Sequence, residues 1–349
     1  MAPPYSIQFY PTLRCNQSCG FCFNRGISNA FSSGDMDLQK ADALGSILVK
    51  AGIHEIDVLG GEPMLINWMR DFVEEMTGSG VSVNISTNGS LPEVVSRLSG
   101  VQTGLMNIGF SLQGLSETHA ALTQADHFST AVSGIRSMIE KGKNPIVKST
   151  LTRQNMPEIH DLVDYLIGLG VKSYFLLHED IIGRQNVMSC FSFPEFRKFH
   201  GELKEKFTEV LDIGFVAASG FYKYGIKSQG RCDAGSEKIA IMPDGSVFPC
   251  NLFAGFEEFC LGNIFRDSID EILGNPSLDY FRQQSGSCGC EMHGCEHYST
   301  CTGGCPAHSY YFHGTMDAVD PRCANVRPQP GRVIMPLTPP HPKGMDNPT

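Results

Sequence analysis

Three cysteines lie close together near the N-terminus, in the stretch "LRCNQSCGFCF". Cys15, Cys19 and Cys22 form a C-x3-C-x2-C spacing. Thiolates are soft ligands that suit iron–sulfur clusters, and a cubane cluster needs one ligand for each iron. Three thiolates on one short loop can hold three irons and leave the fourth open for a ligand from outside the protein. A structural zinc would need four protein ligands and a disulfide two, so neither matches this count.

The wider cysteine pattern supports metal binding over the alternative of three buried structural thiols. The chain has 349 residues, 13 cysteines and a formal net charge of −10. Nine of the cysteines fall between positions 232 and 323, which predicts more than one metal centre. The N-terminus does not resemble a secretion signal, so we expect a cytoplasmic protein whose thiols stay reduced. No long basic block and no membrane-length apolar run is present, so neither nucleic acid nor a membrane is an expected partner.

The elements that must position the first cysteines follow a regular rhythm. Short apolar strands alternate with amphipathic helices six times, which predicts an α/β fold built around a parallel sheet. Several strands end in small polar residues, as expected where loops at the carboxyl edge of a parallel sheet form a site. The predicted strands lie in "SIQFYPT", "IHEIDVLGG", "VSVNISTNG", "MNIGFSLQG", "PIVKSTLT" and "VKSYFLL", with helices at about 36–51, 66–78, 128–141 and 157–168.

The pattern changes after about residue 190. "FSFPEFRKFHGELKEKFTEVL" predicts a long amphipathic helix, beyond which we expect the strand–helix alternation to stop. "KIAIMPDGSVFPC" predicts two short strands joined by a hairpin turn. The end of the chain is rich in proline and poor in apolar residues, so we expect no core there. The predicted units are residues 1–190, a linking segment 191–229, a cysteine-rich unit 230–325 and a tail 326–349.

The chain resembles the radical S-adenosylmethionine (SAM) enzymes. Their hallmark is C-x3-C-x2-C with an aromatic residue before the last cysteine, and here Phe21 precedes Cys22. The resemblance implies a partial, TIM-like (β/α)6 barrel whose open iron is chelated by the amino and carboxylate groups of SAM. It further implies reductive cleavage of SAM to a 5′-deoxyadenosyl radical that abstracts a substrate hydrogen atom. A flavodoxin- or ferredoxin-type protein is the implied electron donor.

The same resemblance implies cofactor-binding residues. "GGEP" resembles the element that binds the SAM amino group, and "STNG" and "SLQG" lie where polar groups meet the SAM ribose and carboxylate. Related enzymes usually have a histidine followed four residues later by arginine, but here His119 is followed by Thr123. Lys148 is a candidate for the missing charge, and a solvent-facing lysine is the alternative. The implied SAM-binding residues are Gly60, Gly61, Glu62, Pro63, Asn88, Ser111 and Lys148.

The later cysteines resemble the SPASM domain, an extension that carries two auxiliary [4Fe–4S] clusters. Lys238 stands where this domain often has a further cysteine, so Cys260 or Cys288 could complete the nearer cluster, or that cluster keeps an open iron. Carried across by position, the nearer cluster would use Cys232, Cys250 and Cys305, and the other Cys290, Cys295, Cys301 and Cys323.

Three reactions are compatible with this resemblance. Modification of a ribosomally made peptide, by a thioether or carbon–carbon cross-link or a related oxidation, ranks first. Sulfatase maturation ranks second, because Asn251 stands where that branch usually has an ionisable aspartate, and action on a small molecule is the third branch. Glu179 and Asp180 follow the sixth strand and are the candidate proton acceptors or substrate contacts. A non-enzymatic iron–sulfur or zinc protein is the distant alternative, since it would not explain "GGEP" or the six repeats.

Overall fold

One continuous sheet organises the molecule. The computed structural model describes residues 6–27, 31, 34–101, 104–182, 190–222, 232–282, 295 and 301–324. Within this part of the chain the strand order is β10-β9-β8-β1-β2-β3-β4-β5-β6-β7, parallel from β8 to β7 and antiparallel across β8, β9 and β10. The strands are β1 (Ser6–Phe9), β2 (Glu55–Val58), β3 (Ser82–Thr87), β4 (Met106–Ser111), β5 (Ile146–Leu151), β6 (Ser173–His178), β7 (Asp212–Val216), β8 (Lys238–Ile241), β9 (Ser246–Phe248) and β10 (Gly262–Asn263).

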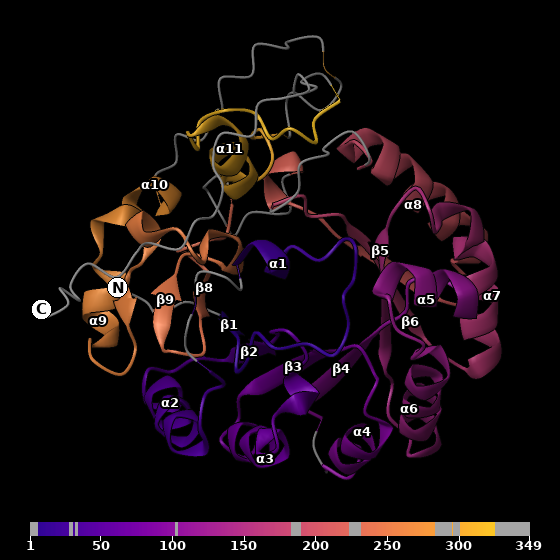
Figure 1. Cartoon of the computed structure of the whole chain (residues 1–349), viewed down its shortest axis with the longest axis horizontal. Helices are drawn as coiled ribbons and strands as arrows, with labels where there is room; N and C mark the ends of the chain where they lie inside the picture. The colour runs from indigo at the N-terminus through magenta and orange to yellow at the C-terminus, as the bar shows by residue number, and fades with distance from the viewer. Residues whose placement is uncertain are drawn as a thin grey trace, which may run out of the picture.

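The helices surround the curved sheet (Figure 1). Helices α2, α3, α4, α6, α7 and α8 line its outer side, whereas α1 lies on its inner side. Because β1 to β6 are parallel and follow one another across the sheet, the predicted partial (β/α)6 barrel is confirmed. The helices are α1 (Asn24–Ile27), α2 (Leu38–Lys50), α3 (Met69–Gly78), α4 (Pro92–Leu98), α5 (Ser116–Thr123), α6 (Phe128–Glu140), α7 (Ile159–Leu169), α8 (Phe193–Phe207), α9 (Ile269–Leu273), α10 (Asp279–Arg282) and α11 (Pro306–His313).

Alternating residues give the two sides of the sheet different characters. In β3, Val83 and Ile85 are buried, whereas Asn84 and Ser86 are partly exposed. Side chains alternate between the faces of a strand, so the apolar set packs under the helices and the polar set lines the inner side. There, Asn84 donates a hydrogen bond to Asp57 of the neighbouring strand (2.9 Å). The inner side of the sheet is therefore polar at β2 and β3.

A seventh parallel strand corrects the prediction for the middle of the chain. The long helix predicted after residue 190 is confirmed as α8, which begins with a capping box between Ser192 and Glu195. However, β7 follows α8 and pairs in parallel with β6, so the expectation that the alternation stops here is wrong. The strand was hard to recognise because Asp212 and Val216 at its two ends are exposed. The predicted domain boundaries themselves stay predictions.

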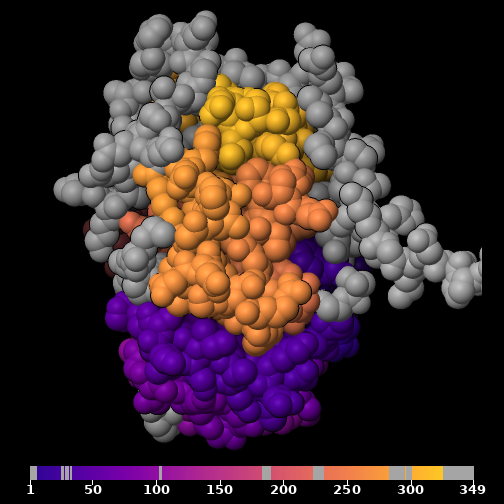
Figure 2. Space-filling view, turned by 90° about the vertical axis from the view of Figure 1, so that its left-hand side faces the viewer, coloured from indigo at the N-terminus to yellow at the C-terminus, as the bar shows by residue number. Residues whose placement is uncertain are grey.

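The predicted hairpin is confirmed as β8 and β9, and it extends the barrel sheet. Strand β8 pairs in parallel with β1 over four residues, with Ser6 opposite Lys238. The segment from β8 to α10, orange in Figure 2, lies against the indigo N-terminal half of the chain. The cysteine-rich unit is thereby joined to the strand that leads into the first cysteines. Among the residues given above, no helix combines the length and apolar character needed to cross a bilayer.

Candidate active site

The loop that carries Cys15, Cys19 and Cys22, here called the cysteine loop (residues 11–23), starts just beyond β1. Its middle is fixed to the end of α5, because the backbone amides of Ser18 and Gly20 donate to the carbonyl oxygens of Thr123 and Leu122 (both 3.0 Å). Thr123, found in place of the expected arginine, thus contacts the cysteine loop through its backbone. The loop lies at the carboxyl edge of the sheet, where a barrel of this kind builds its site.

Two glycines of "GGEP" allow the loop after β2 to approach the cysteine loop closely. Gly61 donates its backbone N–H to the carbonyl of Thr12 (2.9 Å), and the amide of Glu62 donates to the carbonyl of Arg14 (2.8 Å). A Cβ atom on Gly61 would lie 1.9 Å from the Arg14 carbonyl oxygen, and one on Gly60 would lie 2.6 Å from that of Thr12. Only glycine fits at this distance. These residues therefore support the cysteine loop, and their contact with SAM stays a prediction.

Glu62 is a buried carboxylate that joins two loops. Its side chain accepts hydrogen bonds from the backbone amides of Met64 (2.9 Å) and Asn88 (2.7 Å) and from the hydroxyl of Thr87 (2.7 Å). Burial raises its pKa to about 7, and these three donors act in the opposite direction. Pro63 begins a short 3₁₀ turn directly after it. Glu62 thus fixes the loop after β3 against the loop after β2.

Asn88 lies beside the first cysteine. Its side-chain amide donates to Asn16 Oδ1 (2.9 Å) and lies 3.9 Å from Cys15 Sγ. Its own carbonyl oxygen accepts from the backbone amide of Ser90 (2.9 Å), which fixes the orientation of the amide. The structure thus brings Asn88 to the cysteine loop, next to where an iron on Cys15 would lie.

Lys148 and Ser111 lie side by side on β5 and β4. The Lys148 ammonium donates to the hydroxyl of Ser86 (2.9 Å), and burial lowers its pKa while Asp57 opposes that shift. Lys148 therefore points along the inner side of the sheet and not toward solvent as the alternative supposed. A half-buried cation on this side suits an anionic group, such as the SAM carboxylate that the resemblance implies.

Three later cysteines converge around Lys238. Burial raises the pKa of Cys232, Cys250 and Cys305 to about 12, and negative charge on one thiolate would raise the pKa of another. The ammonium of Lys238 opposes this effect at Cys232 and Cys250. Bound iron would keep these thiolates deprotonated, so the trio fits a cluster ligand set.

Neither cysteine group needs to surround a single metal ion in order to bind a cluster. In the part of the chain that the structure describes, no three His, Cys, Asp or Glu side chains converge closely enough to hold one metal ion. A cubane does not require such convergence, because each thiolate binds a different iron. Both the cysteine loop and the trio around Lys238 are compatible with that arrangement.

The other predicted cysteine ligands are only partly placed. The thiol of Cys260 donates to the carbonyl of Gly262 (3.6 Å), and its role as a ligand of the nearer cluster stays a prediction. Cys301 Sγ accepts the backbone N–H of Gly303 (3.2 Å). Cys323 donates its backbone N–H to the Asp320 carbonyl (2.9 Å). Cys295 is half-buried, and Cys288 and Cys290 lie outside the described residues, so the second auxiliary set stays a prediction.

The predicted acids after β6 lie in a joint with the C-terminal unit. Asp180 accepts a hydrogen bond from buried Arg322 (3.1 Å), and its carboxylate lies 3.5 Å from His308. The carbonyl of Glu179 accepts a second bond from Arg322 (3.0 Å), and the Glu179 side chain is only 3 % exposed. Arg322 also pairs with Asp320 (2.8 Å). The Asp180 carboxylate is thus held in an ion pair, and the proton-acceptor or substrate-contact roles of Glu179 and Asp180 stay predictions.

Two residues that complete this joint were not predicted from the sequence, nor was a third that lies between the cysteine loop and the trio. Arg322 and Asp320 gave no signal because their partners are distant in sequence. Tyr10, buried at the end of β1, accepts a hydrogen bond from the Asn251 amide (2.9 Å), and the Asn251 backbone donates to Gln8 (3.0 Å). The pKa of Tyr10 is raised by burial and further by its proximity to Cys22 and Cys250. Tyr10 therefore lies between the cysteine loop and the trio.

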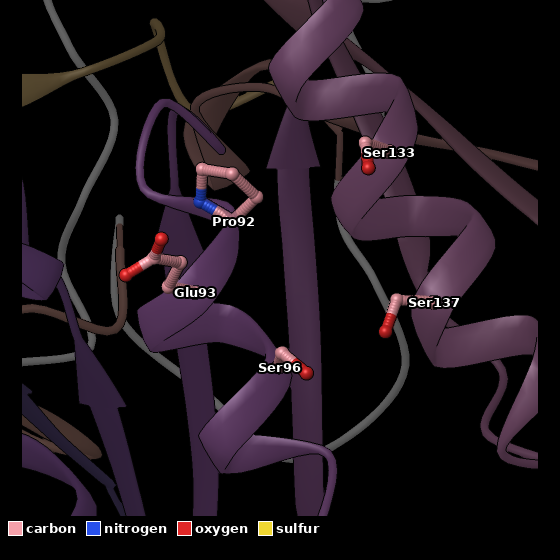
Figure 3. A pocket seen from close by; sticks show the side chains of 5 residues that line it. All are labelled: Pro92, Glu93, Ser96, Ser133 and Ser137. Carbon is pink, nitrogen blue, oxygen red and sulfur yellow. The ribbon is translucent and has the colours of Figure 1, made fainter.

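A separate cavity of about 390 Å³ lies between α4 and α6 (Figure 3). Both helices are on the outer side of the sheet. Its lining is Pro92, Glu93, Ser96, Ser133 and Ser137.

Two family models match the chain in the order of these sites. The radical SAM superfamily matches residues 9–166, which include the cysteine loop and the strands β2 to β5. The iron–sulfur cluster-binding domain named SPASM matches residues 232–305, which include the trio around Lys238.

Similar proteins support the same assignment. The chain is 26 % identical to the subtilosin biosynthesis protein AlbA of Bacillus subtilis over 78 % of its length, but spans only 60 % of AlbA. It is 25 % identical to the mycofactocin maturase MftC of Mycobacterium tuberculosis over 94 % of its length and 84 % of MftC. The crystal structure of Streptococcus suis SuiB bound to SAM has the same fold, with a TM-score of 0.75 and 20 % identity over 93 % of this chain and 78 % of SuiB. The chain thus contains a radical SAM domain followed by a C-terminal SPASM domain.

Proposed function

We propose that this chain cleaves SAM reductively and uses the resulting 5′-deoxyadenosyl radical to abstract a hydrogen atom from a ribosomally made peptide. The carrying observation is the cysteine loop, which presents three thiols at the carboxyl edge of a parallel barrel. When bound there, a [4Fe–4S] cluster supplies the electron that cleaves the sulfonium of SAM.

The residues of the chain have separate roles in this proposal. Gly60 and Gly61 let the loop after β2 support the cysteine loop, and Glu62 fixes the loop after β3 against it. Asn88 lies beside Cys15, and Lys148 supplies a cation on the inner side of the barrel for the SAM carboxylate. Together they would hold SAM in one orientation against the open iron, which is the main way in which a site of this kind gains rate.

The peptide as substrate class is supported by the relatives. AlbA is named for the biosynthesis of a bacteriocin, subtilosin, and MftC is a maturase. SuiB has been crystallised with its precursor peptide SuiA. Sulfatase maturation is less well supported, because the amide of Asn251 cannot ionise and is held by Tyr10.

We further propose a flavodoxin- or ferredoxin-type electron donor and a reducing, cytoplasmic location. No disulfide joins the cysteines that the structure describes, which is compatible with cluster binding in a reducing compartment.

The experiment is anaerobic reconstitution followed by incubation with SAM, dithionite and short peptides encoded beside the gene. The account predicts 5′-deoxyadenosine together with a peptide that has lost hydrogen, detected by mass spectrometry. A Cys19→Ala/Cys22→Ala variant should give neither product. Release of 5′-deoxyadenosine without any change in the peptides would redirect the search to a protein or small-molecule substrate. Absence of 5′-deoxyadenosine, with clusters present, would overturn the proposal.

A further inference from the structure

Cys19 has a side-chain amide as its neighbour. Cys19 Sγ lies 3.6 Å from the carbonyl oxygen of Gln17, and the Gln17 amide nitrogen lies 3.3 Å from Nδ1 of His127. Gln17 therefore links Cys19 of the cysteine loop to the imidazole ring of His127, which lies outside that loop. Neither Gln17 nor His127 belongs to the cysteine and SAM-binding sets assigned above.

His127 is well anchored and can orient this amide. It is the residue that precedes α6, and its carbonyl accepts hydrogen bonds from the backbone amide of Ala131 (3.0 Å) and the hydroxyl of Thr130 (2.8 Å). These bonds fix the backbone of His127, and Gln17 lies on a short, hydrogen-bonded loop. The contact between the two side chains therefore costs little backbone conformational entropy.

The orientation of the amide must differ once Cys19 binds iron. A free thiol can donate its proton to the Gln17 carbonyl, as it does in this structure. An iron-bound thiolate has no proton, so the same carbonyl would face a second acceptor. Rotation of the amide by half a turn, which places N and O in each other's positions, directs an N–H at the sulfur and the carbonyl at His127 Nδ1. That nitrogen then carries the ring proton as donor.

Cys15 of the same loop already has a side-chain amide N–H directed at its sulfur. The Asn88 side-chain amide directs an N–H toward Cys15 Sγ at 3.9 Å. Hydrogen bonds to cluster sulfurs raise the reduction potential, because the donor stabilises the additional negative charge of the reduced form.

We propose that Gln17, oriented by His127, donates an N–H···S hydrogen bond to Cys19 and so raises the reduction potential of the SAM-binding cluster. Gln17 is thus a positioning residue for the cluster, and His127 acts through Gln17. The inference rests on the proposed function only in that the cysteine loop must hold a cluster.

The test compares reconstituted Gln17→Leu, His127→Leu and the double variant with the unsubstituted protein. Gln39→Leu is the matched control, since Gln39 is exposed on α2. Potentiometric titration followed by electron paramagnetic resonance gives the midpoint potential of the cluster whose signal changes when SAM is added. Both single variants should lower this potential, and the double variant should lower it no further than Gln17→Leu. Gln39→Leu should leave it unchanged.

A direct spectroscopic measurement covers the case of poor cluster assembly. In protein whose glutamines are labelled with ¹⁵N, pulsed electron paramagnetic resonance of the reduced cluster should show coupling of the electron spin to the Gln17 amide nitrogen. A Gln17→Glu variant should lack this coupling. An unchanged midpoint potential in Gln17→Leu, or no amide coupling in the unsubstituted protein, would overturn the inference. Neither the midpoint potential nor the coupling to the Gln17 amide nitrogen requires a peptide. If the coupling is present but no peptide is modified, only the proposed function is contradicted.

Discussion

At the residue scale, backbone packing accounts for the glycines of "GGEP". The sequence predicts these residues as a SAM-binding element by resemblance, but their contact with the cysteine loop joins positions more than forty residues apart. No local pattern reveals that a Cβ atom on Gly61 would lie 1.9 Å from the Arg14 carbonyl oxygen. The spacing of the three cysteines, by contrast, was readable because ligands of one cluster lie on a single short loop.

Substitution of Gly61 should therefore disrupt the cysteine loop. In Gly61→Ala the new methyl group displaces the Arg14 backbone, and a misplacement of about 1 Å lowers catalytic rates by roughly 100-fold. The release of 5′-deoxyadenosine should fall by about that factor. Gly78→Ala is the control, because a Cβ atom there meets no neighbour within 4 Å. Equal rates for the two variants would show that the close approach does not matter.

The buried carboxylate of Glu62 gives a prediction about pH. Its pKa is raised from an ordinary value of 4.5 to about 7, so the folded protein holds a proton that the unfolded chain releases in this range. The contribution of protonated Glu62 to the free energy of unfolding is fully present below about pH 4.5 and is lost as the pH rises through about 7. The loss amounts to about 1.4 kcal/mol for each unit of pKa shift.

The comparison is with Glu62→Gln, which cannot ionise. Urea unfolding of the cluster-free proteins between pH 4.5 and 8 should show the unsubstituted protein losing stability relative to the variant as the pH rises. A difference in the free energy of unfolding that stays constant across this range would contradict the assignment.

At the element scale, two of the contacts between the barrel and the cysteine-rich C-terminal part of the chain stand out. Strand β8 pairs with β1, and the loop after β6 binds Arg322 through Asp180 and Glu179. Because the amide of Cys305 donates to Asp320 (2.8 Å), the second joint also positions one of the predicted auxiliary ligands.

The second joint should contribute strongly to stability. Arg322→Met leaves the buried carboxylate of Asp320 unpaired, and breaking a buried pair in this way costs about 3–5 kcal/mol. Arg70→Met is the matched control, because Arg70 pairs with Glu74 on the exposed surface of α3, where such a pair contributes at most about 1 kcal/mol. The free energies of unfolding by urea measure both effects. A loss no larger for Arg322→Met than for Arg70→Met would exclude this role.

Local patterns predicted the elements better than their connections. The alternation in β3 and the signal Ser192 to Glu195 before α8 are visible in the sequence because they involve residues a few positions apart. Strand β7 was missed, since its exposed ends weaken the apolar pattern. The contact of Asp180 with Arg322 spans 142 positions and depends on the tertiary fold, so no local pattern predicts it.

At the scale of the whole molecule, one sheet carries both cysteine groups. The cysteine loop follows β1, and the hairpin that leads to Cys250 is added to the same strand. Tyr10 lies between the two groups and is hydrogen-bonded to Asn251. The cysteine loop follows the carboxyl end of β1, whereas Lys238, around which the trio lies, is paired with Ser6 at the start of that strand.

The proposal that a 5′-deoxyadenosyl radical takes a hydrogen atom from the peptide is tested most directly by following that atom into 5′-deoxyadenosine. The reconstituted enzyme is given a precursor peptide deuterated at its carbon positions, with SAM and a reductant, and the 5′-deoxyadenosine is analysed by mass spectrometry. The account predicts deuterium in the 5′-deoxyadenosine in proportion to the modified peptide. Modified peptide accompanied by 5′-deoxyadenosine that contains no deuterium would contradict it.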